Sequence, residues 1–381
     1  MPLAEMRHTA LVIAAAFGGF AGFFVLLPVI PVVAESLGGP FDAGAVTGAL
    51  MISAVGTQIM SPTLLRVLGY KGLFLVGLGL LGVPALAYGQ VSGTLWMIVA
   101  ITLIRGIGFG ILTVVPPALI ARTTDESRSA SLGTYAFAMA VSGTLGPAAG
   151  LLLFDHSLDA AALVGGLIPI GAALLLSVSR VSSPPVPRLA WRELRFFEGR
   201  GPSSFSRPLF AWLPGSILYG AFYSFVPLWV DGGVPAALAV FGGSFALGRL
   251  TAGMGARRTH PLLLLRIGAA AAAIGVAVIF VTGLGPLIAG SALAGGGVGM
   301  MSLSALLGAL GTVEQKQYPI ATAAWAVSFD GGLATGGLLL GAVVTVAGYD
   351  PAFTVAIGLL LVGVLLTGLR RRDARSAPPG M

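Results

Sequence analysis

Twelve apolar runs, each long enough to cross a lipid bilayer, constrain this chain more than any other feature. They cover residues 9–34, 43–66, 71–90, 94–121, 128–154, 159–180, 207–230, 233–256, 261–283, 285–312, 320–347 and 351–370. A helix needs about 20 apolar residues to span the hydrocarbon core, and in lipid each backbone polar group must be bonded within its own segment. The sequence therefore predicts an all-α integral membrane protein with twelve transmembrane helices. The first run is longer than a signal peptide, so we expect it to be a retained helix.

The composition is that of a membrane protein, and it argues against several other classes of protein and of functional site. Charged residues make up 9% of the 381-residue chain, against about 25% in soluble domains. Cysteine is absent, so no disulfide, thiolate metal site or cysteine nucleophile is expected. His8, His156 and His260 lie near predicted helix ends and form no cluster. We expect no metal and no cofactor, and the net charge of +7 indicates no nucleic-acid partner because no soluble domain would present a basic face.

The connectors between the apolar runs alternate in charge. One set, together with the termini, is basic and holds Arg7, Arg66, Lys71, Arg122, Arg128, Arg180, Arg188, Arg192, Arg195, Arg200, Arg207, Arg257, Arg258, Lys316 and residues 370–372. The other set has no Lys or Arg and holds Glu35, Asp42, Asp155, Asp159, Asp231 and Asp350. Positively charged loops stay on the cytoplasmic side, so both termini are predicted to be cytoplasmic. An even number of helices agrees with that orientation.

The longest connector divides the chain near its middle. It predicts an N-terminal six-helix bundle at 1–182, a cytoplasmic linker at 183–206 and a C-terminal six-helix bundle at 207–381. Within the linker, residues 188–200 mix arginines with large apolar side chains. This stretch is either a short helix in the inner membrane interface or a solvated basic linker.

The two halves are weakly alike at an offset of about 190 residues, the mark of an internal repeat. The corresponding positions are Gly106, Gly108 and Gly110 with Gly295, Gly297 and Gly299, and Ser142 and Gly146 with Gly332 and Gly336. Repeats of six helices are typical of two-bundle transporters.

One acidic residue, Asp330, lies inside the apolar run 321–346. Roughly ten helical residues precede it in that run at about 1.5 Å each, which puts its carboxyl near the middle of the membrane. A charge there costs at least about 2.5–3.5 kcal/mol, so a buried ionisable group is by default a functional hypothesis. The alternative is a protonated or Arg-paired carboxyl that only packs helices.

The run 128–154 carries a patterned set of small residues: Gly133, Ser142, Gly146, Pro147 and Gly150. Gly146 permits close approach of a neighbouring backbone, and Pro147 removes one helical hydrogen bond. The pattern resembles the antiporter motif of the major facilitator superfamily, although Ser142 replaces a usual glycine. With twelve helices, a six-plus-six repeat and a central loop, the resemblance covers essentially the whole chain. It implies two six-helix bundles that rock around a midplane cavity; the alternative is ordinary small-residue packing.

Three further positions resemble functional positions of this superfamily. Arg105 resembles its arginine on the fourth helix, and fold analogy makes Asp330 a candidate partner; the alternative is an arginine satisfied by backbone carbonyls. Gly69 and Lys71 fit the gating motif between helices two and three, whose acidic residue is missing here. Arg249 belongs to the second-half counterpart of that motif. The resemblance thus implies proton coupling at Asp330 and Arg105, and gating at Gly69, Lys71 and Arg249.

Candidates for substrate binding come from helices that line the cavity in that superfamily. Ser216, Tyr219 and Tyr223 fall on one helical face at i, i+3 and i+7. Hydroxyl-bearing aromatic faces suit an amphipathic or aromatic ligand. The remaining candidates are Gln58, Met301 and Ser302. Each of these residues has simple helix packing as its alternative role.

These observations favour a secondary active transporter that exports a small amphipathic molecule, a drug or metabolite, in exchange for protons. The alternative is a symporter or uniporter that imports a small metabolite. A non-transporting membrane sensor is a distant third, and an enzyme is disfavoured because no nucleophile, metal or acid–base cluster is present. The expected partners are the substrate, protons and the lipid bilayer. The resemblance implies a monomer in a bacterial inner membrane.

Overall fold

The structure is a computed structural model that describes residues 3–91, 93–120, 125–178, 206–256, 258–313 and 318–368. Within those ranges the regular secondary structure is helical and contains no strand. The predicted all-α class is therefore confirmed. The predicted linker and its basic stretch at 188–200 lie outside the described residues, apart from Ser206, which begins a helix.

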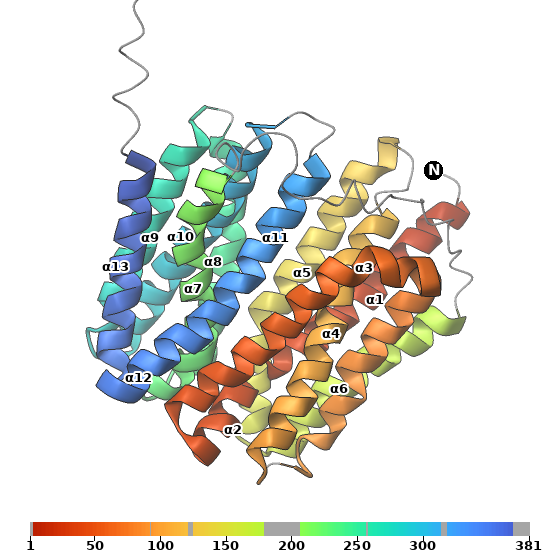
Figure 1. The fold of residues 1–381 in the computed structure, drawn as a ribbon, viewed down its shortest axis with the longest axis horizontal. Coiled ribbons are helices and arrows are strands. Elements are labelled where there is room, and N and C mark those ends of the chain that lie inside the picture. The colour runs from red at the N-terminus through yellow and green to blue at the C-terminus, as the bar shows by residue number, and fades with distance from the viewer. Residues whose placement is uncertain are drawn as a thin grey trace, which may run out of the picture.

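The two halves of the chain lie side by side (Figure 1), with the red-to-yellow helices on the right and the green-to-blue helices on the left. The N-terminal half contains α1 (Leu3–Leu26), α2 (Val29–Gly38), α3 (Pro40–Gly82), the 3-10 turn η1 (Pro84–Ala87), α4 (Leu95–Ile120), α5 (Asp125–Phe154) and α6 (Leu158–Val178). The C-terminal half contains α7 (Ser206–Trp229), α8 (Val234–Gly255), α9 (Pro261–Ile279), α10 (Leu284–Leu310), α11 (Tyr318–Thr335), the π-helical segment η4 (Gly336–Leu340), α12 (Gly341–Ala347) and α13 (Tyr349–Gly368). This arrangement agrees with two helical bundles.

The first predicted crossing is interrupted rather than continuous. Pro28 separates α1 from α2. Proline has no backbone N–H and cannot donate the helical hydrogen bond, so a break at this position follows from its chemistry. Together the two pieces form one apolar span from Arg7 to Gly38.

The second and third predicted crossings form one long element, α3, that bends at Gly69. The backbone there has φ 66° and ψ 173°, outside the helical region. Positive φ is accessible to glycine because it has no Cβ. Lys71 then donates a hydrogen bond of 3.2 Å to the carbonyl of Ser177 near the end of α6, which fixes the bend against the same half.

Length and composition establish ten membrane-length spans among the described residues, with a shorter apolar helix at Tyr349–Leu365. One of the ten, Pro40–Ala87, is 48 residues long and contains the bend in α3. If its two arms and the shorter helix are counted separately, each of the twelve predicted ranges has a helical counterpart.

Glycines repeat the same packing pattern in both halves. In α4, Gly106 and Gly110 meet the first arm of α3, whereas Gly108 meets its second arm. In α10, Gly295 and Gly299 meet α8, whereas Gly297 meets α9. Without a Cβ, each of these positions lets a neighbouring backbone approach closely. The sequence repeat therefore corresponds to a repeat in helix packing.

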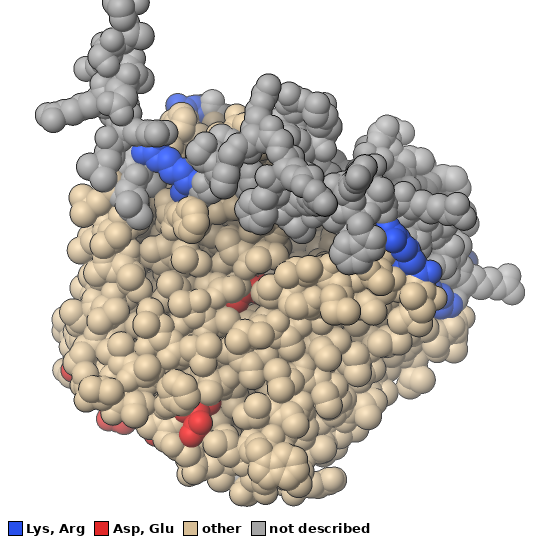
Figure 2. Space-filling view, viewed as in Figure 1, with Lys and Arg blue, Asp and Glu red and all other residues tan. Residues whose placement is uncertain are grey.

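Charges are separated along the helices. Described Lys and Arg side chains lie at the upper edge of the face in Figure 2, whereas acidic atoms lie at its lower edge and near its middle. Among the described side chains, Arg105 and Asp330 are the charged residues that are buried. Such separation is what the alternating connectors predict.

The two halves meet through α3 with α11 and through α5 with α8. Gly44 and Gly337 bring the backbones of α3 and η4 together. Thr47 and Ser224 share a hydrogen bond of 2.8 Å between α3 and α7. These contacts join the bundles and make the region between them the place to look for a coupled site.

Candidate functional site

Asp330 on α11 lies at the junction of the two halves. Its side chain is 3% exposed. One carboxylate oxygen accepts a hydrogen bond of 2.5 Å from the amide nitrogen Nε2 of Gln58 on α3. A bond to an ionised acceptor is roughly twice as strong as a neutral one. The protonation state of Asp330 therefore bears directly on a contact that joins the bundles.

Gln58 is bonded through its nitrogen only. Nε2 also donates to the hydroxyl of Thr113 on α4 at 3.0 Å, and that hydroxyl donates to the carbonyl of Gly110 at 2.9 Å. The amide oxygen Oε1 is buried and has no partner among the described residues. An amide can present either its donor or its acceptor to a carboxyl group. Gln58 is thus suited to contact Asp330 in both the ionised and the protonated form.

Arg105 on α4 is bonded to backbone carbonyls rather than to Asp330. It is 2% exposed, and its Nε donates to Leu81 at 3.2 Å and its Nη2 to Gly22 at 3.4 Å. The guanidinium also lies 5.6 Å from the ring centroid of Tyr88. In this conformation the structure gives the alternative arrangement, an arginine satisfied by carbonyls, in place of the expected pair.

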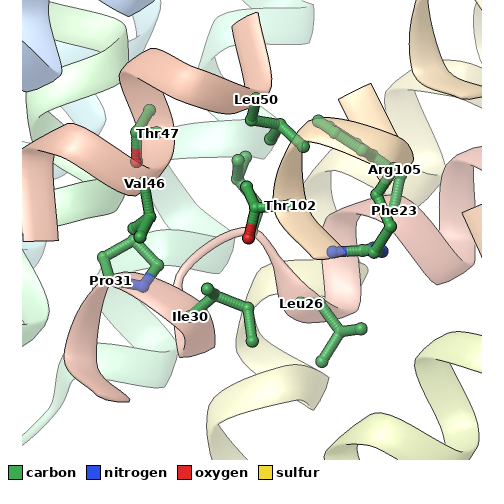
Figure 3. Close-up of a pocket in the computed structure, with 10 residues that line it drawn as sticks. Phe23, Leu26, Ile30, Pro31, Val46, Thr47, Leu50, Thr102 and Arg105 are labelled. Carbon is green, nitrogen blue, oxygen red and sulfur yellow. The ribbon is translucent and has the colours of Figure 1, made fainter. Parts of the chain in front are cut away.

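Arg105 lies in the wall of a small cavity in the N-terminal half (Figure 3). Its empty volume is about 250 Å³, part of it open to solvent. Thr47 and Thr102 are the other polar residues in its wall, and the rest is apolar: Phe23, Leu26, Leu27, Ile30, Pro31, Val46 and Leu50. The cavity therefore offers few hydrogen-bonding groups to a ligand.

The predicted face of α7 is buried, and its three residues have different neighbours. Ser216 donates to backbone carbonyls, one of them that of Ser328 on α11 at 3.4 Å. The hydroxyl of Tyr223 donates to the carbonyl of Gly143 on α5 at 3.3 Å, across the two halves. The ring of Tyr219 lies among aromatic rings, 5.1 Å from that of Phe245 and 5.3 Å from that of Phe329. Of the three, Tyr219 is the one that packs against a ring beside Arg249.

The predicted pair on α10 is fully buried. Met301 and Ser302 are both 0% exposed. The hydroxyl of Ser302 has no partner among the described residues, and its carbonyl accepts a hydrogen bond of 3.0 Å from the indole nitrogen of Trp325 on α11. The carbonyl of Ser302 therefore helps to orient an aromatic ring of α11, the helix that carries Asp330.

The patterned residues of α5 face their own half. Gly146 and Gly150 meet α1, and Ser142 donates to the α1 carbonyl of Phe17 at 3.5 Å. Pro147 lies within the same helix, and Gly133 has open space around it. The neighbouring Gly143 makes the contacts across the two halves, with Tyr223 and with Gly242 of α8.

The three positions with a predicted gating role lie in different parts of the structure. Gly69 and Lys71 form the bend in α3, as described above. Arg249 on α8 lies instead over two aromatic rings, 5.6 Å from the centroid of Trp325 and 5.9 Å from that of Phe245.

Sequence reasoning missed several residues at these sites. Thr113, Gly143, Trp325 and Phe245 were not singled out, because each is an ordinary residue in an apolar helix. From the sequence, such residues could be sought only as polar or aromatic side chains at the same membrane depth as Asp330. This criterion selects particular residues only when the positions of the helices are known.

Comparison with known proteins now identifies the family. Residues 12–307 match the family model of the Major Facilitator Superfamily. A 111-residue stretch is 32% identical to the uncharacterized MFS-type transporter Rv1250 of Mycobacterium tuberculosis, a match over 29% of this chain and 19% of that relative. The chain thus spans about a fifth of the length of that curated relative.

Solved structures agree at the level of the fold. The nucleoside transporter NupG superposes with a TM-score of 0.73 at 15% identity, over 95% of this chain and 99% of its own. The POT family transporter PepTSo superposes with a TM-score of 0.76 at 11% identity, over 97% and 98%. At these identities the likeness concerns the fold. The family-model match, with which the helical repeat and these folds agree, establishes that the chain belongs to the Major Facilitator Superfamily of transporters.

Proposed function

We propose that this chain is a proton-coupled secondary transporter that exports a small amphipathic molecule, a drug or a metabolite, by alternating access. The observation that carries the proposal is the hydrogen bond between Gln58 of the N-terminal half and buried Asp330 of the C-terminal half. An ionisable group at the junction of two bundles lets protonation change how strongly the bundles hold together.

Protonation of Asp330 would act on the junction in a simple way. The ionised carboxylate accepts a strong hydrogen bond from Gln58. A proton neutralises the carboxylate, weakens that bond and reduces the attraction between α3 and α11. The bundles can then rock around the site and expose Asp330 to the other side of the membrane. Proton uptake on one side and release on the other would drive the substrate the opposite way.

Two features favour antiport and therefore export. The small-residue pattern in α5 resembles that of antiporters in the superfamily. The same helix lies at the junction of the halves, where Gly143 accepts a hydrogen bond from Tyr223. A helix that packs on its own bundle through one face and on the other bundle through another is well placed to move between them.

The surroundings of the transporter follow from charge and family. By the positive-inside rule the basic end of the helices faces the cytoplasm, so we propose cytoplasmic termini. The bacterial relative favours a bacterial cell membrane. We propose a monomer whose partners are the substrate, protons and lipid.

A second candidate, import by symport, is favoured by one specific observation. Arg249 lies 5.6 Å from the ring centroid of Trp325, and Trp325 belongs to α11, the helix that carries Asp330. A substrate with a negative group at Arg249 would disfavour a second negative charge on Asp330. Such a substrate would bind together with the proton and move with it.

Proteoliposomes with a trapped pH dye and an acidic interior would test the proposal. We would add cationic, neutral and anionic naphthalene derivatives outside and follow internal pH and compound uptake. Antiport predicts that uptake raises internal pH, because protons leave as the compound enters. A fall in internal pH would indicate symport, and uptake without a pH change would indicate a uniporter. No uptake of any compound would contradict the transport proposal.

A further inference from the structure

Five side chains in the C-terminal half form a group around one cation. Arg249 lies over the rings of Trp325 and Phe245, at 5.6 and 5.9 Å from their centroids. The ring of Tyr219 lies 5.1 Å from that of Phe245 and 5.3 Å from that of Phe329. We call these five residues the Arg249 cluster. They come from α7, α8 and α11.

Among the described residues, Arg249 has aromatic neighbours but no hydrogen-bonded or ion-paired partner. In the part of the chain that the structure describes, no carboxylate lies within ion-pair distance and no acceptor bonds its guanidinium. The guanidinium keeps its charge and carries five N–H donors in a planar fork. Arg105, by contrast, donates to two carbonyls. Of the two arginines, Arg249 is the one whose donors remain available to a ligand.

The aromatic members of the cluster present an accessible and ordered wall. Arg249, Phe245, Trp325 and Phe329 are each partly exposed although they touch one another. The indole of Trp325 is held by its hydrogen bond to the α10 carbonyl. The ring of Phe329 stacks on Trp325 at 6.0 Å and 21°. Flat aromatic surfaces beside a partly exposed cation suit a planar ring that carries a negative group.

The charge of Arg249 favours an anion over a cation at this wall. Asp330 is buried, and its carboxylate is already bonded to Gln58. A cationic ligand beside Arg249 would meet a like charge that forms no ion pair among the described residues, and would be disfavoured there. An anion would instead replace water around the guanidinium with charge-assisted hydrogen bonds.

We infer that the Arg249 cluster binds an aromatic monoanion, with its carboxylate or sulfonate on Arg249 and its ring against Trp325 and Phe329. This inference gives the substrate class of the proposed transporter and rests on that function, but not on the direction of transport or on proton coupling. It assigns Arg249 a ligand in addition to the gating role that the resemblance implies.

Binding of two matched probes tests the inference without any transport. We would titrate naphthalene-2-sulfonate and its neutral counterpart naphthalene-2-sulfonamide into the purified chain by isothermal calorimetry. A neutral detergent without lipid excludes anionic headgroups as competitors. Only the sulfonate can form an ion pair with Arg249, so we expect it to bind at least about tenfold more tightly than the sulfonamide.

Variants separate the contribution of the Arg249 charge to binding from that of the ring contact with Trp325. Arg249→Gln should weaken sulfonate binding by about tenfold or more and leave sulfonamide binding unchanged. Arg249→Lys, which keeps the charge but loses the planar fork, should fall between the two. Trp325→Leu should weaken both probes, because it removes the ring surface. Arg258→Gln removes the same charge from an exposed position just after α8 and should change neither.

The outcomes separate this inference from the transport proposal. Sulfonate binding that depends on Arg249, without transport in proteoliposomes, would support the site and contradict the proposed function. Equal binding of both probes, binding of neither, or an Arg249→Gln variant that matches wild type would overturn the inference, even if transport is observed.

Discussion

Replacing Gln58 with methionine removes the donor to Asp330 while it keeps the length of the side chain. The hydrogen bond is 2.5 Å long, and its acceptor is 3% exposed. A bond to a charged group contributes about 1.5–3 kcal/mol. One pH unit corresponds to about 1.4 kcal/mol, so loss of the bond favours the protonated carboxyl by up to about two units, less whatever the amide contributes to the protonated form. We therefore expect the midpoint of proton-dependent transport to move to higher pH by that amount.

The assay is the initial rate of gradient-driven uptake in proteoliposomes across a series of acidic to alkaline buffers. Thr113→Val is the matched control, because it removes the other hydrogen bond of the Gln58 amide and leaves the contact with Asp330 in place. Its midpoint should move much less. A Gln58→Met variant that still transports with the wild-type midpoint, or with a midpoint at lower pH, would refute the reasoning.

Three further predictions concern packing and the second buried charge. Gly150→Leu would drive a side chain into the backbone of α1 and should lower the free energy of unfolding by at least about 1–3 kcal/mol. The control Gly133→Leu enters open space and should leave the melting temperature in detergent nearly unchanged. Thr47→Val and Ser224→Ala should be non-additive by about 1 kcal/mol in a double-mutant cycle of unfolding, since they share one hydrogen bond; additive effects would mean that the bond contributes nothing. Arg105→Met should lower stability, because two carbonyls lose their donor, and should not move the pH midpoint of transport; a shift like that of Gln58→Met would show that Arg105 acts on Asp330 after all.

The helices were predictable because lipid allows few solutions for an apolar chain. Runs of membrane length gave the spans, and glycine spacing gave the repeat that α4 and α10 display. Local departures from regular α-helix were harder to predict from the sequence. The π-helical segment η4 includes Gly337, whose backbone approaches Gly44 of α3, a contact between segments far apart in the sequence.

Asp330 could be singled out from its depth in an apolar run, but its partner could not. An arginine and an amide both lay at suitable depths, and charge alone favoured Arg105. The structure brings the amide of Gln58 to the carboxylate, whereas the guanidinium reaches carbonyls of α1 and α3. Which of two polar groups meets a third depends on the rotation of each helix about its axis, and an apolar sequence specifies that rotation weakly.

Arg249 illustrates a different limit. Its position in a basic motif at the end of a helix indicated gating, and nothing in that motif refers to α11. Its neighbour Trp325 lies 76 positions further along the chain and reaches it through a contact between helices. Aromatic residues are common in membrane helices, so their presence gave no signal until the fold placed them around the cation.

The central claim, that Asp330 carries the coupled proton, is tested most directly by the pH change that accompanies substrate movement. Proteoliposomes would contain wild type, Asp330→Asn or Asp231→Asn, the last an exposed control in the connection between α7 and α8. Asparagine resembles the protonated carboxyl, so Asp330→Asn should still exchange substrate for substrate but should move no protons, while the control behaves as wild type. Substrate-driven proton movement that persists in Asp330→Asn would contradict the claim.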